Sequence, residues 1–180
     1  MIAIPTCHRA KAFGDWTYKM LKDANHLHKA VLFLQCPEDV RDYGNAYPEL
    51  KIVESPQGLL ETANFISQHF PAGTNIVQLH DDVRHIVKFV SKTHSEEVDD
   101  VDAVFTQAFR LMQAHRLGLG GLFPYNNTFH MSKHAVTTGL SFVHDSVTWA
   151  RAIWQPATGQ VSKLSATTRE LLPLFTLTTV

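Results

Sequence analysis

The 180-residue sequence is poor in several features that define common protein classes. It has only two cysteines, Cys7 and Cys36, and no apolar run approaches the ~20 residues of a membrane-spanning helix. Its formal net charge is −1, so no overall positive field attracts nucleic acid. These absences exclude a disulfide-rich scaffold and a membrane-spanning protein, and a nucleic-acid partner would need a local positive patch.

The two cysteines also lack the close spacing of a zinc motif, and both follow predicted strands. We therefore expect reduced thiols in an intracellular protein. The N-terminus enters a short apolar segment that ends at Pro5, unlike a signal peptide. The expected location is the cytoplasm, or the nucleus in a eukaryote, or the host cytoplasm for a viral protein.

The chain has 44% hydrophobic and 18% charged residues, enough for one well-buried core and therefore a single predicted domain. Apolar strands alternate with helical stripes in the first half. Strands are expected at residues 1–4, 30–34, 50–53 and 74–83, and helices at residues 15–25, after Pro37, and at residues 59–70. Asp15 is expected to cap the first of these helices. This alternation predicts an α/β protein with a mostly parallel sheet flanked by helices.

The second half predicts a smaller, mixed part of the fold. The acidic residues 95–102 read as the solvated start of a helix, in preference to a second metal site, and an apolar helical stripe follows to residue 112. Short strands are expected at residues 129–131 and 140–143. Residues 120–127 combine glycines, aromatics and two amides, which suits either a binding loop or an ordinary turn.

Two adjacent carboxylates, Asp81 and Asp82, end the apolar strand at residues 74–83. At the carboxyl end of a parallel strand they would face the ligand crevice, where Mg²⁺ or Mn²⁺ held by two oxygen donors would bridge a diphosphate. The alternative is a solvated turn, in which Asp is common. Arg9 follows the first strand, either as a phosphate contact or as an ordinary surface residue.

Histidine is abundant, with 11 residues, but no pair has a convincing zinc-ligand spacing. We therefore expect scattered surface and packing histidines.

Four sequence blocks, taken in order along the chain, are more specific than the Asp-Asp pair alone. They are Pro5-Thr6-Cys7-His8-Arg9, the helical block at residues 58–66, residues 70–74 leading to Asp81-Asp82-Val83, and the Asn-Asn block at residues 121–131. Together they resemble the TET/JBP-associated glycosyltransferases over roughly residues 1–145.

This resemblance implies a GT-A (Rossmann-like) fold and transfer of a sugar from a nucleoside-diphosphate sugar, such as UDP-glucose. The implied acceptor is the hydroxyl of a hydroxymethylated pyrimidine in DNA, as in base J synthesis and phage DNA hypermodification. Residues 1–90 would bind the donor and residues 91–155 the acceptor, with a divergent or truncated tail at 156–180.

The resemblance also implies roles for individual residues. A divalent metal, Mn²⁺ or Mg²⁺, would be held by His80, Asp81 and Asp82, with Asp82 also catalytic. Donor contacts are expected from Pro5, Thr6, Arg9, Asn64 and Asp81, and contacts to the sugar or acceptor from Tyr125, Asn126 and Asn127. His144 and Asp145 are nominees for the base that takes the acceptor proton, and an exposed turn is the alternative.

Three departures from the family pattern leave a second hypothesis open. His80 stands where the family usually has a third acid, Ala63 stands where it tends to have an arginine, and no match is found after about Ala152. The chain is therefore either an active glycosyltransferase or a degenerate glycosyltransferase fold kept as a binding or assembly module. A flavodoxin-like nucleotide-binding domain is disfavoured, because no Gly-rich loop follows the first strand.

Overall fold

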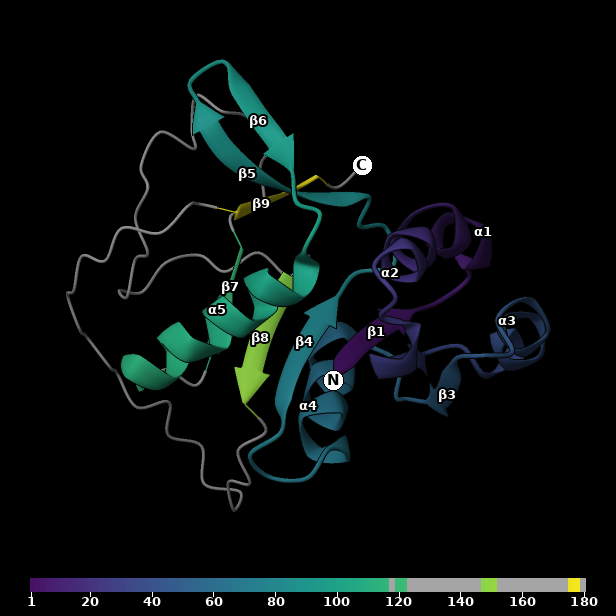
Figure 1. The fold of residues 1–180 in the computed structure, drawn as a ribbon. Helices are drawn as coiled ribbons and strands as arrows, with labels where there is room; N and C mark the ends of the chain where they lie inside the picture. The colour runs from purple at the N-terminus through teal and green to yellow at the C-terminus, as the bar shows by residue number, and fades with distance from the viewer. Residues whose placement is uncertain (117–118, 123–146, 152–174, 179–180) are drawn as a thin grey trace.

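The structure, a computed structural model, describes residues 1–116, 119–122, 147–151 and 175–178 (Figure 1). Its elements, in chain order, are β1 (Ile2–Thr6), α1 (Ala10–Phe13), the π-helical η1 (Gly14–Tyr18), α2 (Lys19–Asp23), η2 (Leu27–Lys29), β2 (Ala30–Leu34), η3 (Pro37–Asp39), α3 (Val40–Ala46), β3 (Lys51–Glu54), α4 (Leu59–His69), β4 (Asn75–Leu79), β5 (His85–Ser91), β6 (His94–Glu97), α5 (Val101–Ala114), β7 (Leu119–Gly121), β8 (Val147–Arg151) and β9 (Phe175–Thr178).

The main sheet has the strand order β3-β2-β1-β4-β8-β7. The first four strands are parallel, whereas β8 runs antiparallel to both β4 and β7. A second, antiparallel sheet has the order β6-β5-β9. The predicted fold class is therefore confirmed, as an α/β protein with a mostly parallel sheet and a mixed second half.

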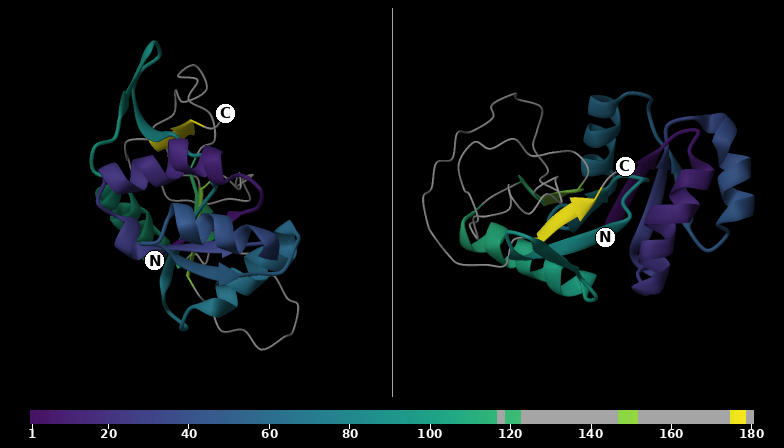
Figure 2. Two further views of the ribbon diagram at one scale, coloured as in Figure 1. Left: turned by 90° about the vertical axis from the view of Figure 1, so that its right-hand side faces the viewer. Right: turned by 90° about the horizontal axis from the view of Figure 1, so that it is seen from above.

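Strands β1 and β2 bury both of their faces. Successive side chains of a strand point to opposite faces, and in β1 Ile2 and Ile4 join one apolar cluster while Ala3 joins the other. The larger cluster includes residues of α1, α2, α3 and α5, and the smaller one includes Ile66 of α4. Figure 2 shows α4 and α5 on opposite sides of the sheet. Helices on both faces explain why these strands read as continuous apolar runs.

One predicted helix start is wrong, and a second is correct only in its last residues. The first helical segment begins at Ala10 and runs without a break through η1 to Asp23, so Asp15 lies inside it and caps nothing. In the acidic segment, residues 94–97 form β6, which pairs with β5, and the helix begins later. There Asp100 caps α5, since its side chain accepts a hydrogen bond from the Ala103 backbone N–H at 2.9 Å.

The expectation of two separate reduced thiols is also wrong for this structure, because Cys7 and Cys36 form a disulfide. Strands β1 and β2 pair in parallel with Thr6 opposite Leu34, so the residues that follow both strands emerge side by side. Their Cα atoms lie 5.4 Å apart, within the range that a disulfide spans. Sequence spacing does not reveal this proximity, since 29 residues separate the two cysteines.

No helix among the described residues has the length and apolar character needed to cross a membrane. The strands expected at residues 129–131 and 140–143 lie outside the described residues.

Candidate functional site

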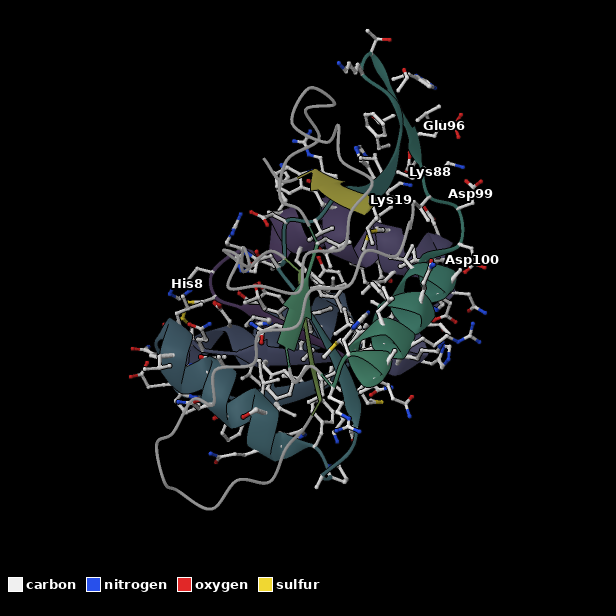
Figure 3. All side chains as sticks on the ribbon, turned by 90° about the vertical axis from the view of Figure 1, so that its left-hand side faces the viewer. His8, Lys19, Lys88, Glu96, Asp99 and Asp100 are labelled. Atoms are coloured by element: carbon white, nitrogen blue, oxygen red, sulfur yellow. A yellow bond between two sulfur atoms is a disulfide. The ribbon has the colours of Figure 1, made fainter. Side chains whose placement is uncertain are left out.

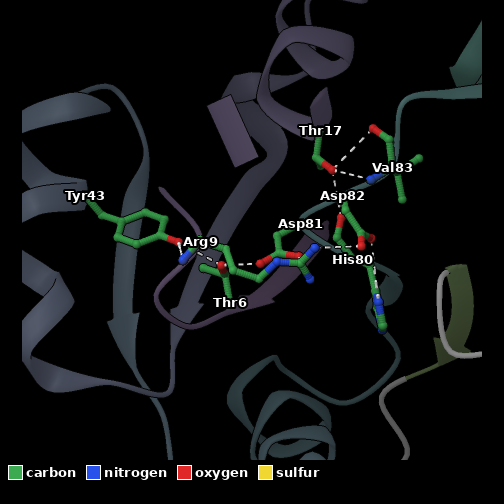
Figure 4. A network of polar contacts seen from close by, with 8 residues as sticks. All are labelled: Thr6, Arg9, Thr17, Tyr43, His80, Asp81, Asp82 and Val83. Carbon is green, nitrogen blue, oxygen red and sulfur yellow. Dashed lines mark hydrogen bonds and ion pairs between the residues drawn. The ribbon is translucent and has the colours of Figure 1, made fainter. Parts of the chain in front are cut away.

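The candidate site lies where the neighbouring parallel strands β1 and β4 end (Figure 4). Thr6 is the last residue of β1, and Asp81 and Asp82 follow β4 by two and three residues. Because carboxyl ends of parallel strands meet at one edge of a sheet, these side chains converge. Together with Arg9 and Tyr43 they form a connected group, named the Asp81 network here (Thr6, Arg9, Tyr43, Asp81 and Asp82).

Asp81 is the buried centre of this network, only 4% exposed. The Thr6 hydroxyl donates a hydrogen bond to Asp81 Oδ2 at 2.6 Å. Burial raises the pKa of Asp81 above its ordinary value, and the Thr6 hydrogen bond and the Arg9 charge offset only part of that rise. The fold therefore holds a carboxylate in an unfavourable environment, which is typical of functional sites.

Tyr43 of α3 extends the network on the side of Thr6. Its hydroxyl lies 2.8 Å from Thr6 Oγ1 and accepts a hydrogen bond from the Arg9 backbone N–H at 3.3 Å. Because the single Thr6 hydroxyl proton goes to Asp81, the Tyr43 hydroxyl must donate to Thr6. Sequence reasoning missed Tyr43; its only signal was an aromatic pair, Tyr43 and Tyr47, at the i, i+4 spacing of a buried helix face.

Arg9 joins the two aspartates through its guanidinium group. Its Nη1 lies 2.9 Å from Asp81 Oδ1, and its Nη2 donates a hydrogen bond to Asp82 Oδ2, also at 2.9 Å. The hydrogen bond to Asp82 raises the pKa of Arg9, which therefore stays charged. Arg9 was expected either as a phosphate contact or as an ordinary surface residue, and in the structure it contacts the two carboxylates.

His80 lies next to the network, on the side of Asp82. His80 Nδ1 lies 3.9 Å from Asp82 Oδ1, and this oxygen is buried without a hydrogen-bond partner. Thr17 of η1 fixes the turn, because its hydroxyl donates to the His80 carbonyl at 2.8 Å and accepts from the Val83 backbone N–H at 2.9 Å. Sequence reasoning missed Thr17, which nothing in its local pattern distinguishes.

The donor set at this site suits a hard divalent cation. Asp82 Oδ1 is a buried acceptor without a hydrogen bond, 3.9 Å from His80 Nδ1, and a cation would satisfy it. Arg9 already supplies positive charge to the other carboxylate oxygens. The residues therefore fit a metal ion at Asp82 Oδ1, and Arg9 would compete with that ion for the remaining oxygens.

The remaining predicted site residues are not part of the network. Pro5 precedes Thr6 on β1 and therefore faces the opposite side of the sheet. Asn64 is exposed on α4, where its backbone carbonyl accepts a hydrogen bond from Ser67. Tyr125, Asn126, Asn127 and Asp145, together with His144, lie outside the described residues.

A separate hollow of about 600 Å³ lies between the first helical segment and the β5, β6 and α5 region. Its lining includes Trp16, Lys19 and Arg84, and the Arg84 guanidinium lies 4.5 Å from the centre of the Trp16 ring. Neither Asp81 nor Asp82 lines it. Its charges are of mixed sign and exposed, so the Asp81 network remains the better candidate site.

Comparison with solved structures gives a context for this geometry. The chain resembles the mannosyltransferase PcManGT from Pyrobaculum calidifontis, solved in complex with GDP-Man and Mn²⁺, with a TM-score of 0.51 and 13% sequence identity. The chain has a GT-A glycosyltransferase fold. The similarity covers 83% of this chain but only 43% of the mannosyltransferase, so the chain spans less than half of its neighbour's length.

Sequence comparisons add nothing to this structural match, because no protein-family model and no curated protein matches the chain. The particular resemblance to TET/JBP-associated glycosyltransferases is therefore not shown by these comparisons, whereas the GT-A fold is.

Proposed function

We propose that this protein is a glycosyltransferase that transfers a sugar from a nucleoside-diphosphate sugar to an acceptor hydroxyl. The observation that supports this most directly is the Asp81 network, in which two carboxylates and an arginine converge at the carboxyl ends of β1 and β4 in a GT-A fold. A mannosyltransferase solved with GDP-Man and Mn²⁺ is a structural neighbour, which is consistent with a nucleotide-sugar donor.

In the proposed mechanism Asp82, with Asp81 and His80 beside it, would hold a divalent metal, Mn²⁺ or Mg²⁺. This ion would neutralise the charge that develops on the leaving diphosphate. Arg9 contacts both carboxylates, and if the metal ion displaced it from them it would supply a second positive charge to the diphosphate. Thr6 and Tyr43 keep Asp81 oriented through their hydrogen bonds.

The finer assignments follow from the resemblance in sequence. We propose UDP-glucose as a donor to test first, beside GDP-mannose, and a hydroxymethylated pyrimidine in DNA as the acceptor. Residues 1–90 would bind the donor, while residues 91–155, including Tyr125, Asn126, Asn127 and the proposed base Asp145, would bind the acceptor.

Titration calorimetry of the full chain with UDP-glucose and GDP-mannose, each with and without Mn²⁺, tests the donor site. We expect binding that requires Mn²⁺ and falls at least tenfold, about 1.4 kcal/mol, in Asp82→Asn. The matched control is Asp42→Asn, an exposed carboxylate of α3 that should bind as the wild type does. Absence of binding for both donors with Mn²⁺ present would contradict a donor site.

Mass spectrometry of nucleosides from hydroxymethylated DNA, incubated with the protein and the donor that binds, tests the reaction. A gain of one hexose on the hydroxymethylpyrimidine is the expected result. Donor binding with no such gain would reject this acceptor while leaving the donor site intact.

The second candidate function is a degenerate GT-A module that binds or assembles without transferring a sugar. The observation that favours it is the pairing of Arg9 with both aspartates, because one of their two negative charges is already balanced without a metal ion. If this second function is correct, the chain should bind neither UDP-glucose nor GDP-mannose, with or without Mn²⁺.

A further inference from the structure

Two cysteines, a histidine and an aspartate meet beside the Asp81 network, and the proposed function uses none of them. Cys7 and His8 follow β1, and Cys36 and Asp39 follow β2. Each residue offers one ligand atom, and these atoms all lie within 4.8 Å of one another. Figure 3 shows His8 at the surface, away from the Lys88 and Glu96 hairpin.

We propose that this group, the Cys7–Cys36 cluster (Cys7, His8, Cys36 and Asp39), binds one Zn²⁺ ion when its disulfide is reduced. The reduction needs an external dithiol reductant. This reductant donates two electrons and two protons to the Cys7 and Cys36 sulfurs and is itself oxidised to a disulfide. Each thiol then loses its proton on ligating the ion, so zinc binding releases two protons. Two thiolates, an imidazole and a carboxylate complete a tetrahedral donor set.

The positions of the four residues agree with this coordination. With zinc–ligand bonds of about 2.0–2.3 Å, the ligand atoms of a tetrahedral site lie about 3.3–3.8 Å apart. His8 Nδ1 and Asp39 Oδ1 are already 3.0 Å apart. The Cα atoms of Cys7 and Cys36 are 5.4 Å apart, so reduced sulfurs can separate by rotation about the Cα–Cβ bonds while the strands stay paired.

A supporting carboxylate is also present. His8 Nε2, the ring nitrogen that would not ligate the ion, lies 3.4 Å from Glu38 Oε1. A histidine that binds a metal commonly donates its other ring N–H to a carboxylate, which orients the ring. The sequence Glu38-Asp39 therefore supplies both a ligand and the group that positions the histidine.

The backbone holds His8 and Asp39 together. His8 has a φ of 54°, in the left-handed region that few non-glycine residues occupy, and its N–H donates to Asp39 Oδ2 at 2.5 Å. Backbone strain of this kind is concentrated at ligand sites.

Cobalt titration of the reduced full chain tests the proposal, because Co²⁺ bound by thiolates gives an intense charge-transfer absorption. We expect this absorption to saturate at one Co²⁺ per chain, to disappear on addition of Zn²⁺, and to be absent from the oxidised protein. His8→Asn and Asp39→Asn should each weaken binding at least tenfold. Cys36→Ser should remove most of the absorption.

Two matched variants separate this site from others. His94→Asn changes a histidine that also lies beside a carboxylate, 3.7 Å from Glu96, but far from any cysteine in sequence, and should bind as the wild type does. Asp82→Asn should leave the cobalt absorption unchanged, so the outcome is independent of the proposed donor site.

Either of two results would overturn the proposal. The first is the absence of stoichiometric cobalt absorption in the reduced wild type. The second is wild-type affinity in both His8→Asn and Asp39→Asn. If circular dichroism shows that Cys36→Ser does not fold, His8→Asn and Asp39→Asn still test the proposal, because both variants retain the two cysteines.

Discussion

Thr6 and Asp81 are 75 residues apart in sequence, yet the Thr6 hydroxyl donates to Asp81 Oδ2 at 2.6 Å. Both side chains are buried, with 3% and 4% exposure. A buried carboxylate needs such donors because water does not reach it. This hydrogen bond connects β1 to the turn after β4 and places the acid of the proposed donor site.

Replacement of Thr6 by the isosteric valine should therefore destabilise the fold. Thr6→Val leaves Asp81 without its hydroxyl donor and the Tyr43 hydroxyl without its acceptor, so we expect a loss of about 1–3 kcal/mol in the free energy of unfolding. Urea denaturation measures this loss. Thr93→Val, in an exposed turn, is the control and should change stability by less than about 0.5 kcal/mol. Equal effects in the two variants would contradict the importance of the buried hydrogen bond.

The ionised Asp81 side chain should lower the free energy of unfolding at neutral pH. Its pKa is raised by burial, so the folded state binds the Asp81 proton more tightly than the unfolded state does. Protonated Asp81 therefore contributes fully to the free energy of unfolding below the pKa of an unfolded aspartate, about 3.9. This contribution is lost as the pH rises through the higher pKa of Asp81 in the folded state.

Asp81→Asn should accordingly unfold at pH 7 with a free energy equal to or greater than that of the wild type, while donor binding falls. The advantage of the variant should shrink as the pH falls below the raised pKa. Urea denaturation at pH 7, 5 and 4 checks this trend. A loss of more than about 2 kcal/mol at pH 7 would mean that the Arg9 ion pair outweighs the cost of burial.

Arg9 should compete with a divalent metal for the aspartates. Arg9→Gln removes the cation that contacts Asp81 and Asp82, so we expect roughly tenfold tighter Mn²⁺ binding together with weaker binding of the nucleotide sugar. Calorimetric titration with Mn²⁺ alone, then with the donor, measures both effects. Lys19→Gln removes an exposed cation paired with Asp23 and should change neither affinity. Weaker Mn²⁺ binding in Arg9→Gln would show that Arg9 supports the metal site instead of competing with it.

Gly58 should tolerate substitution much less well than Gly44. Gly58 precedes α4 with φ 106° and ψ 142°, a conformation nearly restricted to glycine, and a Cβ there would also collide with the Glu61 carboxylate. We expect Gly58→Ala to cost about 1–3 kcal/mol. Gly44 lies inside α3, where a Cβ would make an ordinary contact of 3.9 Å with Ile52 Cδ1. Gly44→Ala should therefore raise stability by up to about 1 kcal/mol, as measured by thermal unfolding.

Local sequence patterns correctly predicted those strands and helices whose burial in the fold matches the pattern. The apolar run at residues 30–34 became β2, and the stripe at residues 59–70 became α4 with its end one residue earlier. Both succeeded because burial of a strand or of one helix face leaves a period in the sequence. Asp15 did not mark a helix start, since an isolated capping residue says nothing about the helical residues before it.

The sequence by itself determined the α/β class and a strand that brings Asp81 and Asp82 to its carboxyl end. Only the tertiary structure decided that Arg9 contacts both carboxylates, that Tyr43 and Thr17 support the site, and that Cys7 meets Cys36. The reason is physical. Periodicity reflects which face of one element is buried, whereas these contacts depend on the order and register in which separate strands pair.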